Sequence, residues 1–337
     1  MSNKVFTINR VSKICNKIGF NKFCYFLNRN RKRVIAYHNI IPDKYFDNSL
    51  HLEYSTKESN FRKHIEIMKK NFNIGLNYMN PSEITLTFDD GYLNQYTVAS
   101  KILNENDIKG YFFCAADLIL GDSMLSADKI SYWISYVPNG HYNLKKYNIC
   151  INIIKDEDRK IQWRKVLDLV NNGEDLEDIA LEMDRLYKFS DISVNMDFYD
   201  LRFNPIRKEL LDRMKECGHK IGAHSACHKP LSSLSKELLT IDIQKCKSMI
   251  GTYYNTKVFC YPFGSIKEVN NEVIKEVKSN GFESAFSFTF YKEGKYYDKF
   301  FMPRIELPNT NNEYIIDFIL SGAMELIKYK RLLPKIY

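Results

Sequence analysis

Short apolar segments with the composition of β-strands alternate with segments of helical periodicity along most of this chain. In one intervening segment Phe61, Ile65, Met68 and Phe72 recur at helical spacing. Strands that alternate with helices form parallel β/α units, and about seven of them favour a barrel over an open sheet. We therefore expect an α/β fold, an irregular (β/α) barrel of about seven parallel strands with a helical insertion. The predicted strands are residues 34–38, 84–88, 110–115, 220–224, 258–262, 284–288 and 302–307.

One long stretch interrupts the alternation. Residues 117–205 separate the third predicted strand from the helix that precedes the fourth, and they contain both tryptophans, Trp133 and Trp163. We expect a mostly helical insertion on a β/α loop. Such loops at the C-terminal face of a barrel select the substrate, although the insertion could equally be a decoration that only packs on the barrel. The other expected segments are a basic amphipathic N-terminal segment at 1–33, the barrel with its insertion at 34–310, and a helical tail at 311–337.

Positive charge is concentrated at the N-terminus. The formal net charge is +8, and residues 1–33 hold nine lysines and arginines and no acid, so the remainder is nearly neutral. Nucleic-acid binding is therefore not expected. An apolar set at helical spacing runs through the same segment, which predicts either a basic helix on an anionic membrane surface or a helix packed on the barrel with solvated cations. That set is Val5, Ile8, Val11, Ile14, Cys15 and Ile18.

The cysteines and the apolar runs bear on the compartment. Eight cysteines form no CxxC pair, and several lie in apolar runs, as Cys114 does. In a chain of 337 residues this pattern is typical of buried free thiols in a reducing compartment. No apolar run has the length of a signal peptide core or a membrane span. We expect a cytoplasmic protein, peripheral at the inner face of the membrane if the N-terminal helix binds lipid.

Two adjacent aspartates, Asp89 and Asp90, directly follow a well-defined strand pattern. Residues 84–88 alternate apolar residues with threonine, as in a strand with one buried face, and Gly91 follows the aspartates. Carboxylates this close resist joint ionisation unless a cation or a proton intervenes. Because Asp and Gly are also ordinary turn residues, this stretch alone leaves a turn and a functional site open.

Two histidines, His224 and His228, follow another predicted strand. If a helix begins there, their spacing of four places both rings on one face. Two histidines and a carboxylate match a three-ligand metal site with open positions, although an isolated histidine pair is more often structural.

Polar or turn residues also end other predicted strands. His38 ends the first, the sequence Tyr-Pro-Phe-Gly at 261–264 ends the fifth, and Arg304 lies inside the seventh. A buried arginine needs a carboxylate partner or a route to water. Because strand ends converge on one face of a barrel, we expect these residues to lie near the aspartates and histidines.

The motifs TFDDG (87–91), HSACH (224–228) and YPFG (261–264), in this order, resemble those of the polysaccharide deacetylase family, the metal-dependent carbohydrate esterases of NodB homology. The resemblance spans about residues 34–307 apart from the insertion. It implies that Asp89 is the general base and that Asp90, His224 and His228 hold one divalent metal ion. Zinc is the expected ion, and nickel, cobalt or magnesium are possible substitutes in vitro.

The chain departs from the common family pattern in two places. Position 260 is Cys where many members carry an arginine that holds the base, and no histidine follows residue 228 to act as the usual acid. The resemblance to the branch with a Tyr-Pro-aromatic-Gly motif implies that Arg304 replaces the arginine and that His38 is the general acid. It also implies that the oxyanion is stabilised by a backbone N–H, that of Phe263, within a substrate site formed by Tyr261, Pro262 and Phe263.

The activity that this resemblance implies is hydrolysis of an N-acyl group, acetyl or formyl, from an amino sugar. The stretch LSADKISYWI (125–134) and the insertion look like those of members that act in bacterial surface-polysaccharide or lipopolysaccharide pathways. The expected substrate is an intracellular glycan precursor, either lipid-linked or nucleotide-linked. Two alternatives remain: deacylation of a non-sugar amide by the same site, and a catalytically silent carbohydrate-binding relative.

Overall fold

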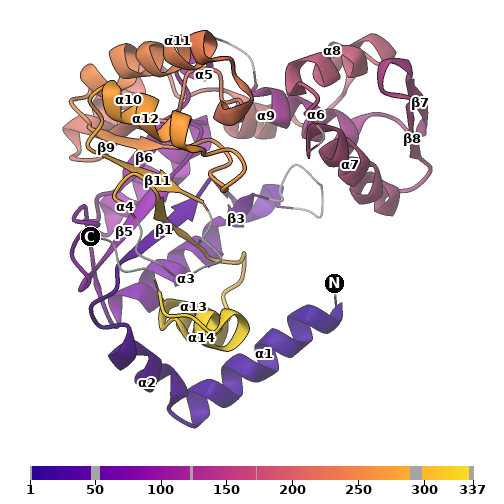
Figure 1. The fold of residues 1–337 in the computed structure, drawn as a ribbon. Helices are drawn as coiled ribbons and strands as arrows, with labels where there is room; N and C mark the ends of the chain where they lie inside the picture. The colour runs from indigo at the N-terminus through magenta and orange to yellow at the C-terminus, as the bar shows by residue number, and fades with distance from the viewer. Residues whose placement is uncertain (1, 47–53, 122–123, 172, 289–297, 334–337) are drawn as a thin grey trace.

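The centre of the protein is a nearly closed barrel of parallel strands (Figure 1). The computed structural model describes residues 2–46, 54–121, 124–171, 173–288 and 298–333, apart from the side chains of residues 2–7 and 171. Within the described residues, the barrel is formed by β12 (Met302–Pro303), β11 (Ser284–Ser287), β10 (Val258–Cys260), β9 (Lys220–Ala223), β6 (Tyr111–Cys114), β5 (Glu83–Phe88), β1 (Arg33–Tyr37) and β13 (Ile305–Glu306), in this spatial order. The predicted (β/α) barrel is confirmed.

The barrel closes at Arg304. The strands β12 and β13 stand at the two ends of the sheet order, yet Arg304 alone separates them in the chain. Pro303 pairs with Ser287 of β11, and Ile305 pairs with Ile35 of β1. The seventh predicted strand is therefore two short strands, because the segment leaves one neighbour and joins the other. Pro303 lacks an N–H, which favours this interruption of the ladder.

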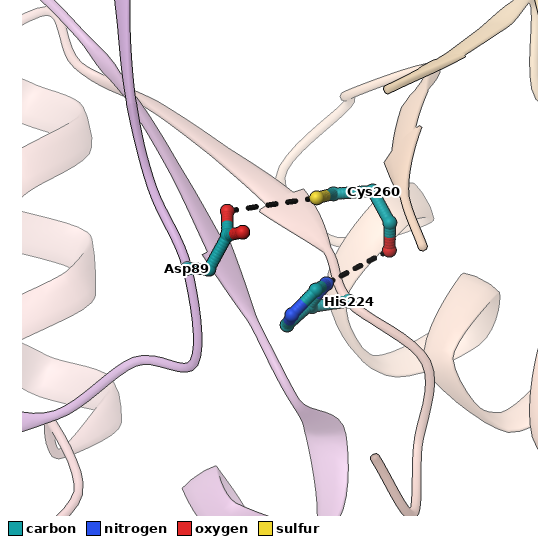
Figure 2. Close-up of side chains that lie close together, drawn as sticks. All are labelled: Asp89, His224 and Cys260. Carbon is teal, nitrogen blue, oxygen red and sulfur yellow. Dashed lines mark hydrogen bonds between the residues drawn. The ribbon is translucent and has the colours of Figure 1, made fainter. Parts of the chain in front are cut away.

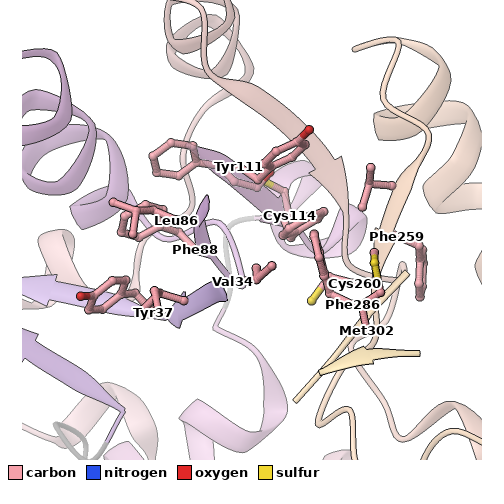
Figure 3. Packing of buried hydrophobic residues seen from close by; sticks show 14 of the residues in the cluster. Val34, Tyr37, Leu86, Phe88, Tyr111, Cys114, Phe259, Cys260, Phe286 and Met302 are labelled. Atoms are coloured by element: carbon pink, nitrogen blue, oxygen red, sulfur yellow. The ribbon is translucent and has the colours of Figure 1, made fainter. Parts of the chain in front are cut away.

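Barrel strands are buried on both faces. All five residues of β1 are buried, and Phe88 of β5 stacks on Phe112 of β6 with ring centroids 4.7 Å apart. Figure 3 shows Phe88 among other buried side chains of the strands. Thr85 and Thr87 are also fully buried, so the alternating pattern of β5 does not mark an exposed face. Strands of a parallel barrel are covered by helices outside and by packed side chains inside. The buried hydroxyl of Thr87 has a hydrogen-bond partner, because it donates to the carbonyl oxygen of Ile35 at 2.9 Å.

Helices between the strands cover the outside of the barrel. The periodicity that predicted the first of them is confirmed, since Phe61, Ile65 and Met68 are buried. Two short pairings lie beside the barrel: β4 (Asn73–Ile74) pairs with β5, and β2 (Asn39–Ile41) pairs with β3 (Ser55–Lys57). The covering helices are α3 (Glu58–Lys69), α4 (Lys101–Glu105), α10 (Lys208–Glu216), α11 (Lys236–Cys246) and α12 (Asn271–Ser279).

The segment between β6 and β9 packs around a hydrophobic cluster of its own. Its centre is the fully buried Trp133, whose Nε1–H donates to the carbonyl oxygen of Tyr187 at 2.8 Å. An antiparallel hairpin, absent from the predicted helical pattern, adds Tyr142, whose ring lies 4.8 Å from Trp133. Figure 1 shows α6–α8 and the hairpin gathered to one side of the barrel. The segment comprises α5 (Ala116–Leu120), α6 (Ser126–Tyr136), β7 (Gly140–Leu144), β8 (Ile149–Ile153), α7 (Asp156–Asn171), α8 (Leu176–Leu186) and α9 (Met196–Phe203).

Helices from the two ends of the chain pack together. In Figure 1, α13 (Glu313–Leu320) and α14 (Ala323–Tyr329) lie between the barrel and α1 (Ser2–Lys17), and α2 (Phe20–Leu27) links α1 to β1. Asp317 of α13 accepts hydrogen bonds from Asn21 at 2.6 Å and Tyr25 at 2.9 Å. The side chain of Val5, part of the predicted apolar stripe, lies outside the described residues. Among the helices of the described chain, none combines the length and apolar character needed to cross a bilayer.

Candidate active site

The strand ends that the sequence singled out meet at one cavity of about 300 Å³. Asp89 and Asp90 follow β5, His38 follows β1 and His224 follows β9. Arg304 reaches the cavity from the seam between β12 and β13. The predicted site residues that line it are His38, Asp89, Asp90, His224, His228, Tyr261, Phe263 and Arg304.

Asp89 is held by a bidentate ion pair with Arg304, and both side chains are almost fully buried. Arg304 Nη1 donates to Asp89 Oδ1 at 2.7 Å and Nη2 donates to Oδ2 at 2.6 Å. The remaining donors are satisfied by Thr87 Oγ1 at 3.0 Å and the carbonyl oxygen of Ser287 at 3.2 Å. Burial alone would raise the pKa of Asp89, but the Arg304 guanidinium outweighs it and lowers that pKa to about 2. Asp89 is therefore a buried carboxylate that is ionised at neutral pH.

Cys260 connects Asp89 with the first histidine (Figure 2). Its thiol donates to Asp89 Oδ1 at 3.5 Å, and its carbonyl oxygen accepts from His224 Nδ1 at 2.8 Å. Because a carbonyl only accepts, Nδ1 carries the ring proton and Nε2 keeps its lone pair. Burial lowers the pKa of His224 to about 4, so the ring is neutral and its Nε2 is a competent metal ligand.

Two groups of side chains have the spacing of a metal site. The ligand atoms of Asp89, His224 and Cys260 lie within 4.8 Å of one another, as do those of Asp90, His224 and His228. In the first group both Asp89 oxygens already bind Arg304, and burial raises the pKa of the Cys260 thiol, which disfavours the thiolate that a metal needs. The second group is therefore the better candidate.

The geometry of Asp90, His224 and His228 fits a divalent ion. The Nε2 atoms of His228 and His224 lie 3.2 and 3.7 Å from Asp90 Oδ1. Two atoms bound to one tetrahedral zinc lie about 3.4 Å apart. Asp90 Oδ1 is buried and, within the described residues, accepts no hydrogen bond. Burial would raise the pKa of Asp90, but the adjacent imidazoles lower it, which leaves an anion that needs a cation.

Left-handed backbone conformations gather at this site. Asp90, Ser225, His228 and Phe263 have φ angles of 84°, 62°, 52° and 58°. Such conformations cost free energy in residues other than glycine and persist where the surrounding structure enforces them. In the described chain a tight loop, and not a helix, brings the rings of His224 and His228 together, with ring centroids 4.9 Å apart.

A residue that the sequence analysis missed holds this loop. Asp242 is buried on α11, and its carboxylate accepts from the backbone N–H groups of Ala226 at 3.0 Å and Cys227 at 2.8 Å. The sequence does contain a sign of this role, because Asp242 lies on the same side of its helix as Leu239 and Ile243, which are buried. A carboxylate on a buried side of a helix needs a hydrogen-bond partner.

His38 lies beside Asp89 without a direct hydrogen bond to it. Its Nε2 is 3.9 Å from Asp89 Oδ2, and its side chain is 20% exposed. Gln95, also missed by the sequence analysis, lies in a π-helical turn and donates from Nε2 to the carbonyl oxygens of both His38, at 3.0 Å, and Asp89. Gln95 thereby ties the end of β1 to the end of β5. A π-helical turn is common at functional sites.

The YPFG segment forms one wall of the cavity. Tyr261 is anchored inward, where its hydroxyl donates to the carbonyl oxygen of Phe300 at 2.9 Å. The half-exposed Phe263 ring lies 5.4 Å from the His228 ring. Gly264 has a φ of 63°, and a Cβ there would lie 2.5 Å from the backbone N of Phe288, so only glycine fits. Pro262 belongs to this turn, and its carbonyl oxygen accepts from Gly264 N at 2.6 Å.

The segment between β6 and β9 supplies the opposite wall. Trp163, Leu167 and Val170 of α7 form an apolar strip along the cavity. Beside them, Arg202 donates to Asp128 Oδ1 at 2.6 Å. The sequence analysis left open whether this segment selects the substrate or only packs on the barrel, and it assigned none of these residues to a site.

The family comparison agrees with this geometry. Residues 186–285 match the family model described as polysaccharide deacetylase. The matched region contains both histidines, Cys260 and the YPFG turn, while Asp89 and Asp90 lie outside it. Residues 186–285 therefore resemble a polysaccharide deacetylase domain, and the match covers less than half of the chain. This match supports a hydrolytic, amide-cleaving enzyme, and the resemblance drawn from the motifs is confirmed.

Comparison with curated proteins gave no match. Among solved structures, the chain is similar to IcaB from Ammonifex degensii (12% identity, TM-score 0.49, covering 87% of this chain and 97% of that one). It is also similar to the deacetylase PplD of Streptococcus pyogenes in complex with acetate (13%, 0.48, 83% and 93%) and to a de-N-acetylase from Aggregatibacter actinomycetemcomitans (13%, 0.49, 82% and 94%).

Replacing Arg304 by Ala should leave Asp89 buried without a counter-charge. We expect the free energy of unfolding at pH 7 to fall by about 3–5 kcal/mol, measured by urea denaturation of metal-free protein. Because the folded-state pKa of Asp89 is depressed, the stabilisation is complete above the unfolded pKa and is lost as pH falls toward 2. The deficit of the variant should therefore shrink in that range. Arg304→Lys, which keeps one charge, should lose less, and a deficit independent of pH would contradict this account.

Proposed function

We propose that the protein is a metal-dependent hydrolase that removes an acetyl or formyl group from the nitrogen of an amino sugar in a bacterial surface-polysaccharide or lipopolysaccharide precursor. The observation that carries the proposal is the placement of Asp89, held by Arg304, beside the Asp90–His224–His228 triad in one cavity. This arrangement brings a fixed base next to a cation site, which is the requirement for hydrolysis without a covalent intermediate.

The metal is proposed to be one zinc ion held by Asp90, His224 and His228. The donor set of two imidazoles and one carboxylate suits zinc, and the protonated Nδ1 of His224 fixes the ring for binding through Nε2. When bound, the ion would supply Lewis acidity, both lowering the pKa of a water molecule and polarising the amide carbonyl. That help is needed, because a carboxylate with a pKa of about 2 is a weak base.

The remaining roles follow from position. Asp89 accepts the water proton, and Arg304 keeps the carboxylate ionised and oriented. His38, 3.9 Å from Asp89, delivers a proton to the departing amine. The backbone N–H of Phe263 faces the developing oxyanion in this proposal, and the left-handed φ of 58° holds that peptide in place.

The substrate class is inferred from the cavity walls. The apolar strip of Trp163, Leu167 and Val170 suits the methyl group of an acetyl substituent and the apolar face of a sugar ring. Both arginines of the cavity, Arg202 and Arg304, already pair with carboxylates. A nucleotide-linked or lipid-linked precursor would therefore place its phosphate outside the cavity. A non-sugar amide remains the second candidate, since the same apolar strip would accept it.

We propose a cytoplasmic location. All eight cysteines lie in the described chain and are free thiols. Five are buried, two are partly buried and one is exposed, a pattern that suits a reducing compartment.

Removing one metal ligand tests the cation site. We expect His228→Ala to lose bound zinc in elemental analysis and to lose turnover, whereas His141→Ala, which changes a histidine of the distant hairpin, should retain both. Chelation should abolish the activity of the wild type, and added zinc should restore it. Full turnover by a verified metal-free preparation would overturn the proposed metal.

Replacing the base separates binding from chemistry. Asp89→Asn should keep the metal and lower the turnover of an N-acetylated amino-sugar panel about 10²–10⁴-fold, measured as acetate or formate release by mass spectrometry. Asp107→Asn, at an exposed site, is the control. Turnover of simple aliphatic amides but of no amino sugar would favour the second candidate. Absence of turnover on every substrate, with metal bound, would favour a silent relative.

The role of His38 as acid predicts a dependence on the leaving group. His38→Ala should strongly lower hydrolysis of an N-acetylated alkyl amine or amino sugar, because the amine leaves only when protonated. Hydrolysis of an acetylated aniline with electron-withdrawing groups should fall much less. Equal losses on both substrates would assign His38 a structural role.

A further inference from the structure

The helices α1 and α2 expose a surface in which cations and large apolar side chains alternate. In and just after α1, the exposed residues recur at helical spacing, so they lie on one side of the helix. In and just after α2 a second such stripe is exposed. We call these two stripes the outer face, and its residues are Arg10, Lys13, Ile14, Lys17, Ile18, Lys22, Phe23, Phe26 and Arg29.

The opposite side of α1 and α2 packs against α13 and α14. Cys15 and Cys24 are buried in a cluster with Phe318 of α13 and Ala323 of α14. Polar groups add to this contact: Asn21 and Tyr25 donate to Asp317, and Asn28 donates to the carbonyl oxygen of Ser321 at 3.0 Å. Packing against α13 and α14 therefore explains only this buried side of α1 and α2, which we call the inner face. It leaves the outer face unexplained.

Four large apolar side chains of the outer face are open to solvent. Ile14, Ile18, Phe23 and Phe26 are between 49% and 71% exposed. Exposed apolar residues scattered singly need no explanation, but four on two adjoining helices form a patch that is typical of an interaction surface. Figure 1 places α1 and α2 at an edge of the molecule, on the side of α13 and α14 that faces away from the barrel.

The charge of this surface is of one sign. Residues 1–33 contain nine cations and no acid, and of these Arg33 is turned inward, where its Nε donates to the carbonyl oxygen of Leu320 at 2.8 Å. Arg29 lies over the Phe26 ring at 4.3 Å from its centroid, so a cation and an aromatic ring share one place on the surface. The inner-face acid, Asp317, is already occupied by hydrogen bonds from α2.

From this surface we propose that the outer face of α1 and α2 docks the protein onto an anionic lipid bilayer. The interfacial region of a bilayer accepts both kinds of side chain at once: isoleucine and phenylalanine enter the acyl boundary while lysine and arginine stay beside the phosphates. A second copy of this chain fits less well, because a two-fold contact would oppose two positive surfaces. A nucleic acid would match the cations but would leave Ile14 and Ile18 unburied. The inference goes beyond the proposed activity and does not depend on it.

Vesicle sedimentation of the full chain tests the proposal without an activity assay. We expect the protein to sediment with vesicles of equal parts phosphatidylglycerol and phosphatidylcholine at about 0.1 M salt, but not with phosphatidylcholine alone. Because the Debye length falls from about 10 Å at 0.1 M to about 3 Å at 1 M, binding should weaken as salt is raised.

Two pairs of variants separate the apolar and the charged contributions. Phe23→Ser with Phe26→Ser should reduce vesicle binding more than about tenfold, whereas Leu238→Ser with Ile241→Ser, equally exposed on α11, should not. Lys17→Gln with Lys22→Gln should reduce it by about fivefold for each charge removed, and Lys236→Gln with Lys275→Gln is the control for charge. All eight positions are exposed, so the variants should fold, which circular dichroism checks.

Three outcomes would overturn the proposal. The first is no sedimentation of the wild type at low salt. The second is equal loss of binding in the α11 controls, which would mean non-specific adhesion. The third is a wild-type dimer, seen by light scattering, that becomes monomeric in the Phe23/Phe26 variant, because the outer face would then be covered by a second copy.

Discussion

The ion pair between Arg304 and Asp89 is the contact on which both the barrel and the site depend. Arg304 lies between the two strands where the barrel closes, and its guanidinium also binds Thr87 of β5 and the carbonyl oxygen of Ser287 of β11. One side chain therefore joins the seam of the barrel to strands on either side of it. Because both side chains are buried, each charge offsets the cost of burying the other, and removing one partner would leave an uncompensated buried charge.

This pair also separates the two adjacent carboxylates by function. Asp89 is neutralised by an arginine and has no free oxygen for a metal, whereas the Oδ1 atom of Asp90 faces two imidazole nitrogens. Like charges on neighbouring residues can both persist because each has a separate cation or cation site. Asp90 has a left-handed φ of 84°, a conformation that costs free energy in a residue other than glycine and persists only where the surrounding structure enforces it.

Much of the fold was predictable because strand and helix periodicity are local properties. All seven predicted strands occur, with the seventh divided at Arg304. The hairpin at Gly140–Leu144 and Ile149–Ile153 was missed, because short strands inside a helical region differ little from helix in periodicity. Whether a helix begins at His224 stayed open, because a spacing of four residues is shared by a helix and by a tight loop with left-handed residues. Gln95 and Asp242 were missed because they act through backbone groups that no side-chain motif records.

The sequence by itself determined the order of strands and helices, the acidic and histidine motifs at their ends, and the concentration of positive charge in residues 1–33. These are properties of neighbouring residues, so they can be read along the chain. Only the tertiary structure decided which carboxylate pairs with Arg304, since 214 residues of intervening chain place no limit on that choice. The same holds for the wall that α7 supplies and for the face of α1 and α2 left exposed after α13 has covered the other. Burial depends on how the elements pack together. The sequence pattern alone therefore does not specify which side of α1 and α2 is buried and which side is exposed.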